Sequence, residues 1–315
     1  MRLLLAFLLL LAQTALAQPW PSRPIRVIVP FSPGGPVDVV ARLITPKMSE
    51  ALGQPIVIEN KTGAGGNLGV SQVAKSPADG YTVLATSSSF AVNPALAPDA
   101  GYHAEKDFIP IAIVASQPNF IVVNAAFPAK TLAELLQMAR TQKLAFASPS
   151  SGTTPHLTAE NLFKVHAKVD LTHVPFRGAG PAAAAVLGGE PPIGSMAGTA
   201  PMPHIRSGKM RALAVSASRR VPSLPDVPTL GELGFTDMED YTWVGIFVPA
   251  ATPPEIAQKL NQVVLATVQN PEIRARLEAL TFEITAAPLR ETSDYVHREL
   301  VKWARVVRDT GAKAE

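Results

Sequence analysis

The sequence predicts an α/β fold with two sets of mostly parallel strands, and three observations support this prediction. Strand-like and helix-like segments alternate along the chain with the spacing of βαβ units. Hydrophobic residues make up 47% of the 315 residues, which is enough to build a large core. The 30 prolines fall between hydrophobic runs, so they mark loop boundaries rather than disorder.

The first set of units occupies the N-terminal third of the chain. Residues 25–30 read as a strand, and the apolar residues of 37–52 recur at helical spacing up to Gly53, a residue typical of helix C-termini. The further elements of this set are strands at 55–58 and 81–85, a helix at 67–75 and a long β-rich stretch at 108–123.

A second set follows, and it begins with a capping box. Thr131 and Glu134 stand three residues apart, so each side chain can satisfy a free backbone N–H group of the helix start. The expected elements are strands 144–148, 171–176 and 211–216, helices 155–165 and 181–187, a Pro- and Gly-rich connector 219–234, strand 241–248, helices 254–269, 271–280 and 292–310, and a short strand 282–286.

The chain has two sets of α/β units, followed by C-terminal helices that belong to neither set. This arrangement favours a protein of two lobes. The chain is expected to pass to the second lobe near 122–125 and to return near 238–245. We therefore predict that residues 18–123 and 242–315 form lobe 1 and that residues 124–241 form lobe 2. A hinge joins the two lobes in this interpretation.

The N-terminus predicts export. Arg2 precedes an apolar run, and Ala15 and Ala17 are the small residues that a signal peptidase recognises. A membrane anchor is the alternative, but the run is shorter than the roughly 20 residues that span a bilayer. We expect residues 1–17 to be a signal peptide that is cleaved after Ala17, and we expect a periplasmic protein.

Composition and spacing exclude several classes of function. The formal net charge is only +3 and the basic residues are scattered, so nucleic acid is not an expected partner. Cysteine is absent and the six histidines lack zinc-binding spacing, so we expect no metal and no other cofactor. No G-x-S-x-G motif occurs, so no catalytic residue is assigned.

A glycine-containing loop follows the first predicted strand. Its candidate ligand-binding residues are Phe31, Ser32, Gly34, Gly35 and Asp38. Glycines let the backbone approach a ligand closely, and the free N–H groups at a helix start attract an anion. In the alternative, this is an ordinary turn in which Asp38 pairs with Arg42 at i+4.

Two further loops combine small residues with hydroxyl groups at the ends of predicted strands. The first is a serine loop, and its alternative role is to cap a helix. The second stands at the start of a helix in lobe 2. Each lobe therefore offers a strand-to-helix loop that can bind an anion. The candidates are Ser87 and Ser88 in the serine loop and Ser150, Ser151, Gly152, Thr153 and His156 in the loop of lobe 2.

Eight short segments resemble the Bug/TctC-type solute receptors of tripartite tricarboxylate transporters, and they occur in order through the mature chain. Among them are Phe-Ser-Pro-Gly-Gly-Pro-Val-Asp (31–38), Glu-Asn-Lys-Thr-Gly-Ala-Gly-Gly-Asn (59–67), Ala-Asp-Gly-Tyr-Thr (78–82), His-Val-Pro-Phe-Arg-Gly (173–178) and Gly-Lys-Met-Arg-Ala-Leu-Ala-Val (208–215). The resemblance implies a two-lobed type II periplasmic binding protein, in which both lobes close on a small organic acid. It also implies delivery to a membrane permease, and we expect a monomer.

One departure from the family pattern bears on the ligand. Family members often carry an aspartate where Met196 stands here, and some use it for a ligand amino group. A methionine cannot pair with an ammonium group, so we predict a carboxylate without an amino group and include Met196 among the candidate ligand-binding residues.

Two alternatives remain open at this point. An exported α/β hydrolase would use the serine-rich loops with His156, but no orienting carboxylate can be named for a triad. A receptor that feeds a sensor protein instead of a permease would have the same fold and the same site.

Overall fold

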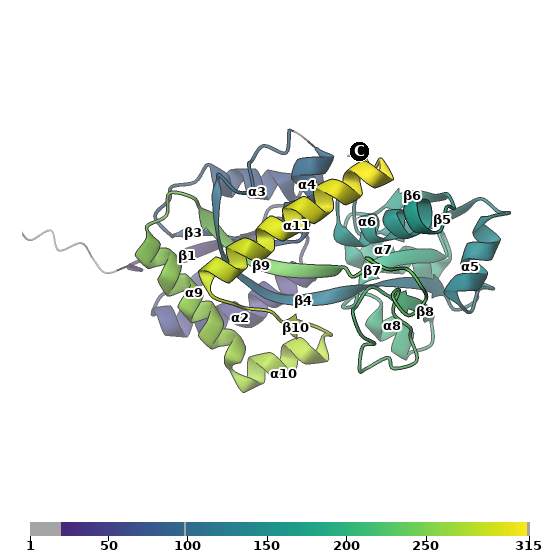
Figure 1. Cartoon of the computed structure of the whole chain (residues 1–315). Coiled ribbons are helices and arrows are strands. Elements are labelled where there is room, and N and C mark those ends of the chain that lie inside the picture. The colour runs from purple at the N-terminus through teal and green to yellow at the C-terminus, as the bar shows by residue number, and fades with distance from the viewer. Residues whose placement is uncertain (1–19, 98, 314–315) are drawn as a thin grey trace, which may run out of the picture.

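The computed structural model describes residues 20–97 and 99–313, so the predicted signal peptide lies outside the described residues. Two α/β lobes lie side by side, and two long strands run between them (Figure 1). In the described part of the chain, no helix is both long enough and apolar enough to cross a membrane.

Lobe 1 contains the N-terminal units together with the C-terminal helices. Its N-terminal elements are β1 (Ile25–Val29), α2 (Pro36–Leu52), β2 (Ile56–Asn60), the 3₁₀ turn η1 (Ala64–Gly66), α3 (Asn67–Ala74), β3 (Thr82–Ser87) and α4 (Ser89–Leu96). Its C-terminal elements are α9 (Pro254–Gln269), α10 (Pro271–Ala279), β10 (Glu283–Ile284) and α11 (Leu289–Thr310).

Lobe 2 is formed by the middle of the chain. Its elements are α5 (Leu132–Ala139), β5 (Leu144–Ser148), α6 (Thr154–Glu160), the π-helical turn η2 (Asn161–His166), β6 (Leu171–Pro175), α7 (Ala179–Gly188), β7 (Ile193–Ala197), α8 (Met202–Arg206) and β8 (Met210–Val215). Strands β5 and β6 are parallel, as the βαβ spacing predicts. Strand β7, which was not predicted from the sequence, is also parallel to β5.

Strands β4 (Phe108–Asn124) and β9 (Tyr241–Pro249) join the lobes. The sheet order is β2-β1-β3-β9-β4-β7-β5-β6, with β8 and β10 also paired to β4. Strand β4 pairs with β9 from Phe108 to Pro118 and with β7 and β8 from Asn119 onward. The strands that pair with β4 thus change within β4 itself. The predicted boundaries between the lobes, at 123/124 and 241/242, stay a prediction.

Apolar side chains fill both faces of the sheet in lobe 1. One core lies under α2 and α9, where Ile44 and Leu260 pack against the strands. The other lies under α3, α4 and α11 and contains Phe90, Trp243 and Trp303. Because both faces are covered, the strands of lobe 1 carry continuous apolar runs rather than an alternating pattern.

The structure contains two helices that the sequence analysis did not predict, α4 and α8. Pro94 lies inside α4, and proline in a helix interior argues against a helix on propensity alone. Pro203 lies in the first turn of α8, where proline is tolerated, but α8 is only 5 residues long and gives little periodic signal. Tertiary packing offsets that cost in α4, because Phe90, Val92 and Leu96 are buried. The predicted helix 155–165 is split into α6 and η2, and β10 is shorter than the predicted strand.

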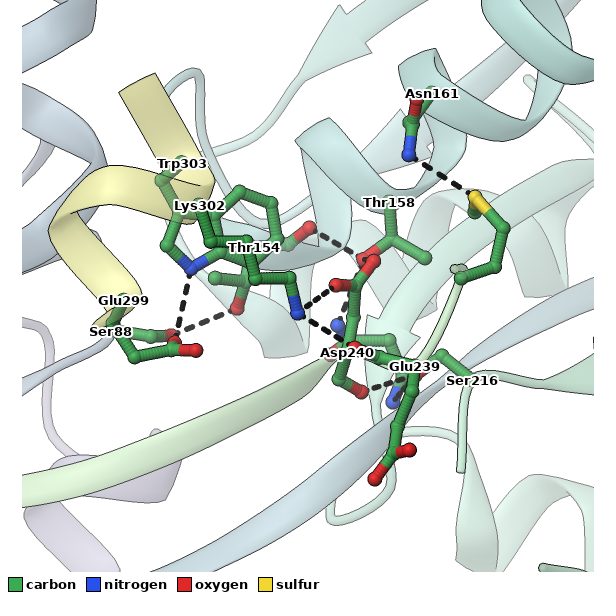
Figure 2. A network of polar contacts seen from close by, with 12 residues as sticks. Ser88, Thr154, Thr158, Asn161, Ser216, Glu239, Asp240, Glu299, Lys302 and Trp303 are labelled. Atoms are coloured by element: carbon green, nitrogen blue, oxygen red, sulfur yellow. Dashed lines mark hydrogen bonds and ion pairs between the residues drawn. The ribbon is translucent and has the colours of Figure 1, made fainter. Parts of the chain in front are cut away.

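Helix α11 starts on lobe 1 and crosses toward α6 of lobe 2 (Figure 1). Trp243 Nε1 and Trp303 Nε1 both donate hydrogen bonds to Glu299 Oε2, at 2.9 and 3.0 Å. One turn along the same helix, Lys302 Nζ lies 2.6 Å from the buried carboxylate of Asp240 (Figure 2). These contacts fasten α11 to β9 and to the segment that enters it.

We predict that Lys302→Met lowers the free energy of unfolding by about 3 kcal/mol, because it leaves the Asp240 carboxylate buried without its cation. Urea unfolding measures the change, with Lys106→Met as a control at an exposed lysine. The double variant Asp240→Asn/Lys302→Met should recover part of the loss. Equal stability of Lys302→Met and the wild type would contradict the role of this ion pair.

Candidate functional site

The loops at the carboxyl ends of the strands meet between the two lobes. Ser88 Oγ, after β3 of lobe 1, shares a 2.8 Å hydrogen bond with Thr154 Oγ1 at the start of α6. A Cβ atom at Gly152 would lie 2.5 Å from Asn93 Oδ1, and one at Gly65 would lie 3.4 Å from the Ser151 carbonyl oxygen. The predicted loops of the two lobes are therefore in direct contact.

The loop between β1 and α2 is held together by the side chain of Asp38. The Gly34 N–H and Arg42 Nε each donate to Asp38 Oδ2 at 2.9 Å, and Asn60 Nδ2 donates to Oδ1 at the same distance. Burial opposes ionisation of Asp38, but the hydrogen bonds from Arg42, Gly34 and Asn60 hold its pKa below the ordinary value. Both carboxylate oxygens of Asp38 thus accept hydrogen bonds from groups of the protein. This arrangement is the one expected in the alternative interpretation, in which the loop is an ordinary turn and Asp38 pairs with Arg42.

The other candidates of this loop lie nearer the surface. Ser32 and Gly34 are exposed, and Gly35 and Phe31 are partly buried. The Phe31 ring packs against the loop of η1, where a Cβ atom at Gly66 would lie 3.1 Å from it. This packing joins the β1–α2 loop to the glycine-rich segment that precedes α3.

The serine loop is buried and connects the lobes. Ser88 is fully buried, and Ser87 Oγ donates to Ser89 Oγ at 3.1 Å. From Ser88 a chain of hydrogen bonds continues through Thr154, Thr242 and Asn119 to Thr158, with donor–acceptor distances of 2.8 to 3.0 Å. Figure 2 shows part of this chain beside Asp240 and Lys302. Thr242 and Asn119 belong to the strands that join the lobes, so the chain couples the hinge to both loops.

Two stacked histidines support the loop of lobe 2. The rings of His156 and His173 are nearly parallel, at 17°, with centroids 3.8 Å apart. The Gly152 N–H donates to His156 Nδ1 at 3.3 Å, and His173 Nε2 shares a 2.7 Å hydrogen bond with Ser148 Oγ. His156 therefore contacts the backbone of the loop from behind rather than from the side of the cavity.

Burial is the main cause that lowers the pKa of His156 to about 3 and that of His173 to about 4. The positive charge of Lys164 adds to both shifts, and that of a protonated His173 adds to the shift of His156. The rings are neutral near pH 7, which permits the close stack. Two imidazolium rings at this distance would repel each other.

Between the lobes lies a cavity of about 630 Å³. Lobe 1 contributes Gly65, Asn67, Leu68, Ser71 and Asn93 to its wall, and lobe 2 contributes Ser150, Ser151, Phe176 and Arg177. Its size lies within the range of roughly 300–1,000 Å³ that is usual for small-molecule sites. Within residues 20–97 and 99–313, no three His, Asp or Glu side chains are grouped to hold a metal ion.

Of the predicted residues, Ser150 and Ser151 line this cavity, and Gly152, Thr153 and His156 support their loop. Met196 is in a different place. It lies in the middle of β7, is fully buried, and belongs to the apolar core with Phe120 and Val186. The structure therefore does not bring Met196 together with the other candidates.

Five polar residues that line the cavity were not among the predicted ones: Asn67, Ser71, Asn93, Asp99 and Arg177. Arg177 stands just beyond Phe176, the first residue after β6, so the rule that ligands bind beyond strand ends would have found it. Gln117 is not part of the cavity wall and lies fully buried in β4. Its Oε1 accepts hydrogen bonds from the N–H and hydroxyl of Thr199, and its Nε2 has no partner among the described residues.

We predict that acid destabilises the protein through the stacked histidines. Below pH 6.5 both histidines take up protons in the unfolded chain but not in the folded chain, down to about pH 3 for His156 and about pH 4 for His173. The free energy of unfolding should fall by about 1.4 kcal/mol per histidine for each pH unit in this window. Urea unfolding from pH 7 to 4.5 measures the slope, which should be shallower in His173→Gln; an equal slope would contradict the prediction.

Comparison with known proteins identifies relatives along almost the whole chain. Residues 40–312 match the family described as tripartite tricarboxylate transporter family receptor, TctC. The protein BugT of Bordetella pertussis is 36% identical over 321 residues, which cover 99% of this chain and 98% of BugT.

Solved structures show the same architecture. MatC from Rhodopseudomonas palustris, with bound malate, is 35% identical with a TM-score of 0.86, covering 91% of this chain and 100% of MatC. Rpa4515 of R. palustris, with adipate, is 32% identical with a TM-score of 0.88, covering 93% of this chain and 99% of Rpa4515. The predicted α/β fold of a periplasmic binding protein is thus confirmed. The chain belongs to the TctC, or Bug, family of periplasmic solute receptors.

Proposed function

We propose that this receptor binds a small carboxylate without an amino group in the cavity between its lobes and delivers it to the membrane permease of a tripartite tricarboxylate transporter. The protein acts in the periplasm after cleavage behind Ala17. It is a receptor and not an enzyme.

The observation that carries the proposal is the composition of the cavity wall. Both lobes supply amide and hydroxyl groups, among them Asn67, Ser71 and Ser150, and lobe 2 adds the cation of Arg177. Hydrogen-bond donors together with a guanidinium group suit a carboxylate. A ligand that contacts both lobes stabilises their closed arrangement by its differential contacts, which is the mechanism of such receptors.

One feature of the candidate loops argues against an amino group on the ligand. Asp38 uses both carboxylate oxygens within its own loop, so neither oxygen is free for an ammonium group. Asp99 also lines the cavity, but it is exposed to solvent, where an ion pair contributes little. The relatives solved with malate and adipate hold acids without an amino group.

The hydrolase alternative is disfavoured by the serines themselves. Ser151 Oγ is buried and has no hydrogen-bond partner among the described residues, so no base activates it. Ser148 does contact His173, but Ser148 is fully buried and cannot reach a substrate. A sensor protein as the partner remains the alternative to a permease, and a pull-down from membrane extracts separates the two.

We predict that malate, succinate or adipate binds the purified mature protein and that aspartate and glutamate do not. Isothermal titration calorimetry measures binding, and small-angle scattering should detect compaction with the same acid. Tight binding of aspartate or glutamate, with no binding of the other acids, would overturn the proposed ligand class. Absence of both binding and compaction across the panel would contradict the receptor site itself.

Gly152 provides a second test, because it lies where the lobes meet. It has a φ of +75°, and an added Cβ would lie 2.5 Å from Asn93 Oδ1 and 2.9 Å from Leu96 Cδ2. We predict that Gly152→Ala weakens binding of the acid at least about tenfold, since about 1–2 kcal/mol of backbone strain adds to the clash. Gly188→Ala, where a Cβ meets no atom within 4 Å, is the matched control. Equal affinities of Gly152→Ala and the wild type would contradict this role.

A further inference from the structure

The wall of the cavity contains large apolar side chains that a site for a very small acid would not need. Leu68 stands at the second position of α3 with 61% of its surface exposed, and it is one of the few large apolar side chains so exposed in the described chain. It lines the cavity from lobe 1, where Leu96 forms a second apolar contact surface. A single exposed leucine is ordinary, but this one lines a cavity that also has an apolar wall on the other lobe.

Phe176 provides that second apolar wall. It lies in the loop between β6 and α7, and it is only partly buried although it is large and apolar. Its backbone is well anchored, because the Phe176 N–H donates to the Ser148 carbonyl at 3.0 Å and the Gly178 N–H donates to the Pro149 carbonyl at 2.8 Å. The Phe176 side chain packs partly against the apolar core of lobe 2, and it lines the cavity from this fixed part of the lobe.

Arg177 stands between Phe176 and Gly178, whose backbone N–H groups are both hydrogen-bonded. Its side chain is exposed, it lines the cavity, and it forms no ion pair with any described residue. It is the only lysine or arginine among the residues that line the cavity as the structure describes it. A guanidinium group on an anchored loop offers two parallel N–H donors to a carboxylate.

We propose that Arg177 holds a carboxylate of the ligand and that the ligand carries an apolar body, a ring or a chain of about six carbons, between Leu68 and Phe176. This inference rests on the proposed function and names its substrate class. A cavity of about 630 Å³ is large for a four-carbon acid. A hydroxyl group of a short hydroxy acid would also have no hydrogen-bond partner where it faced the apolar side chains of Leu68 and Phe176.

One competing role for Arg177 can be separated by experiment. Asp99 lies on the lobe 1 side of the same cavity, so Arg177 and Asp99 could instead attract each other as the lobes close. Removal of the Asp99 charge would then weaken binding as much as removal of the Arg177 charge. If Arg177 holds the ligand, Asp99→Asn keeps or improves the affinity for an acid.

The test compares phenylacetate with succinate by isothermal titration calorimetry. The wild type should bind phenylacetate at least about tenfold more tightly. Arg177→Met should weaken both acids at least about tenfold, because each loses its charge-assisted hydrogen bonds. Leu68→Ser should weaken phenylacetate alone. Arg140→Met and Val301→Ser remove an exposed arginine and an exposed valine away from the cavity, and they should leave both affinities unchanged.

Each other result contradicts a defined part of the proposal. Tighter binding of succinate than of phenylacetate overturns the apolar body while the proposed function stands. Unchanged affinity in Arg177→Met, or an equal loss in Asp99→Asn, overturns the role of Arg177. If neither these acids nor malate and adipate bind the folded wild type, the proposed function fails as a whole.

Discussion

The backbone ladder between β4 and β9 is the constraint on which the rest of the molecule depends. The two strands pair from Phe108 to Pro118, and β4 then continues as a strand of the second lobe. The two lobes thus share one strand. Their loops are held at a fixed distance from the point at which β4 passes from one lobe to the other. Contacts such as Ser88–Thr154 and Gly152–Asn93 require that distance, because each joins loops from different lobes.

Polar side chains hold the shape of two candidate ligand-binding loops, the loop between β1 and α2 and the loop of lobe 2 that follows β5. Asp38 organises one loop through three donors, and His156 with its stacked neighbour His173 organises another. Such support fixes the direction of backbone and hydroxyl groups before a ligand arrives, which lowers the entropy lost on binding. The two lobes use different chemistry for the same purpose, a carboxylate in one and neutral imidazoles in the other.

The alternation of strands and helices was readable from the sequence because apolar periodicity and glycine caps are local signals. The Asp38–Arg42 pair was also readable, since i,i+4 spacing fixes it within one helix. Helix α4 was not, because Pro94 opposes it and only burial of Phe90 and Leu96 in the folded chain offsets that cost. The positions of Met196 and Arg177 depend on which side of a strand or loop faces the cavity, and that is decided by packing between segments far apart in sequence.

The paired tryptophans beside the hinge have a consequence for observing the molecule. Trp243 belongs to a strand that joins the lobes, Trp303 belongs to the helix that reaches across them, and both indoles donate to the one carboxylate of Glu299. The chain has only three tryptophans. Indole emission responds to nearby charge, so two of the three indoles would report a change in the field at Glu299. If the lobes close on a ligand as proposed and α11 moves with them, this emission would follow the closure without an attached dye.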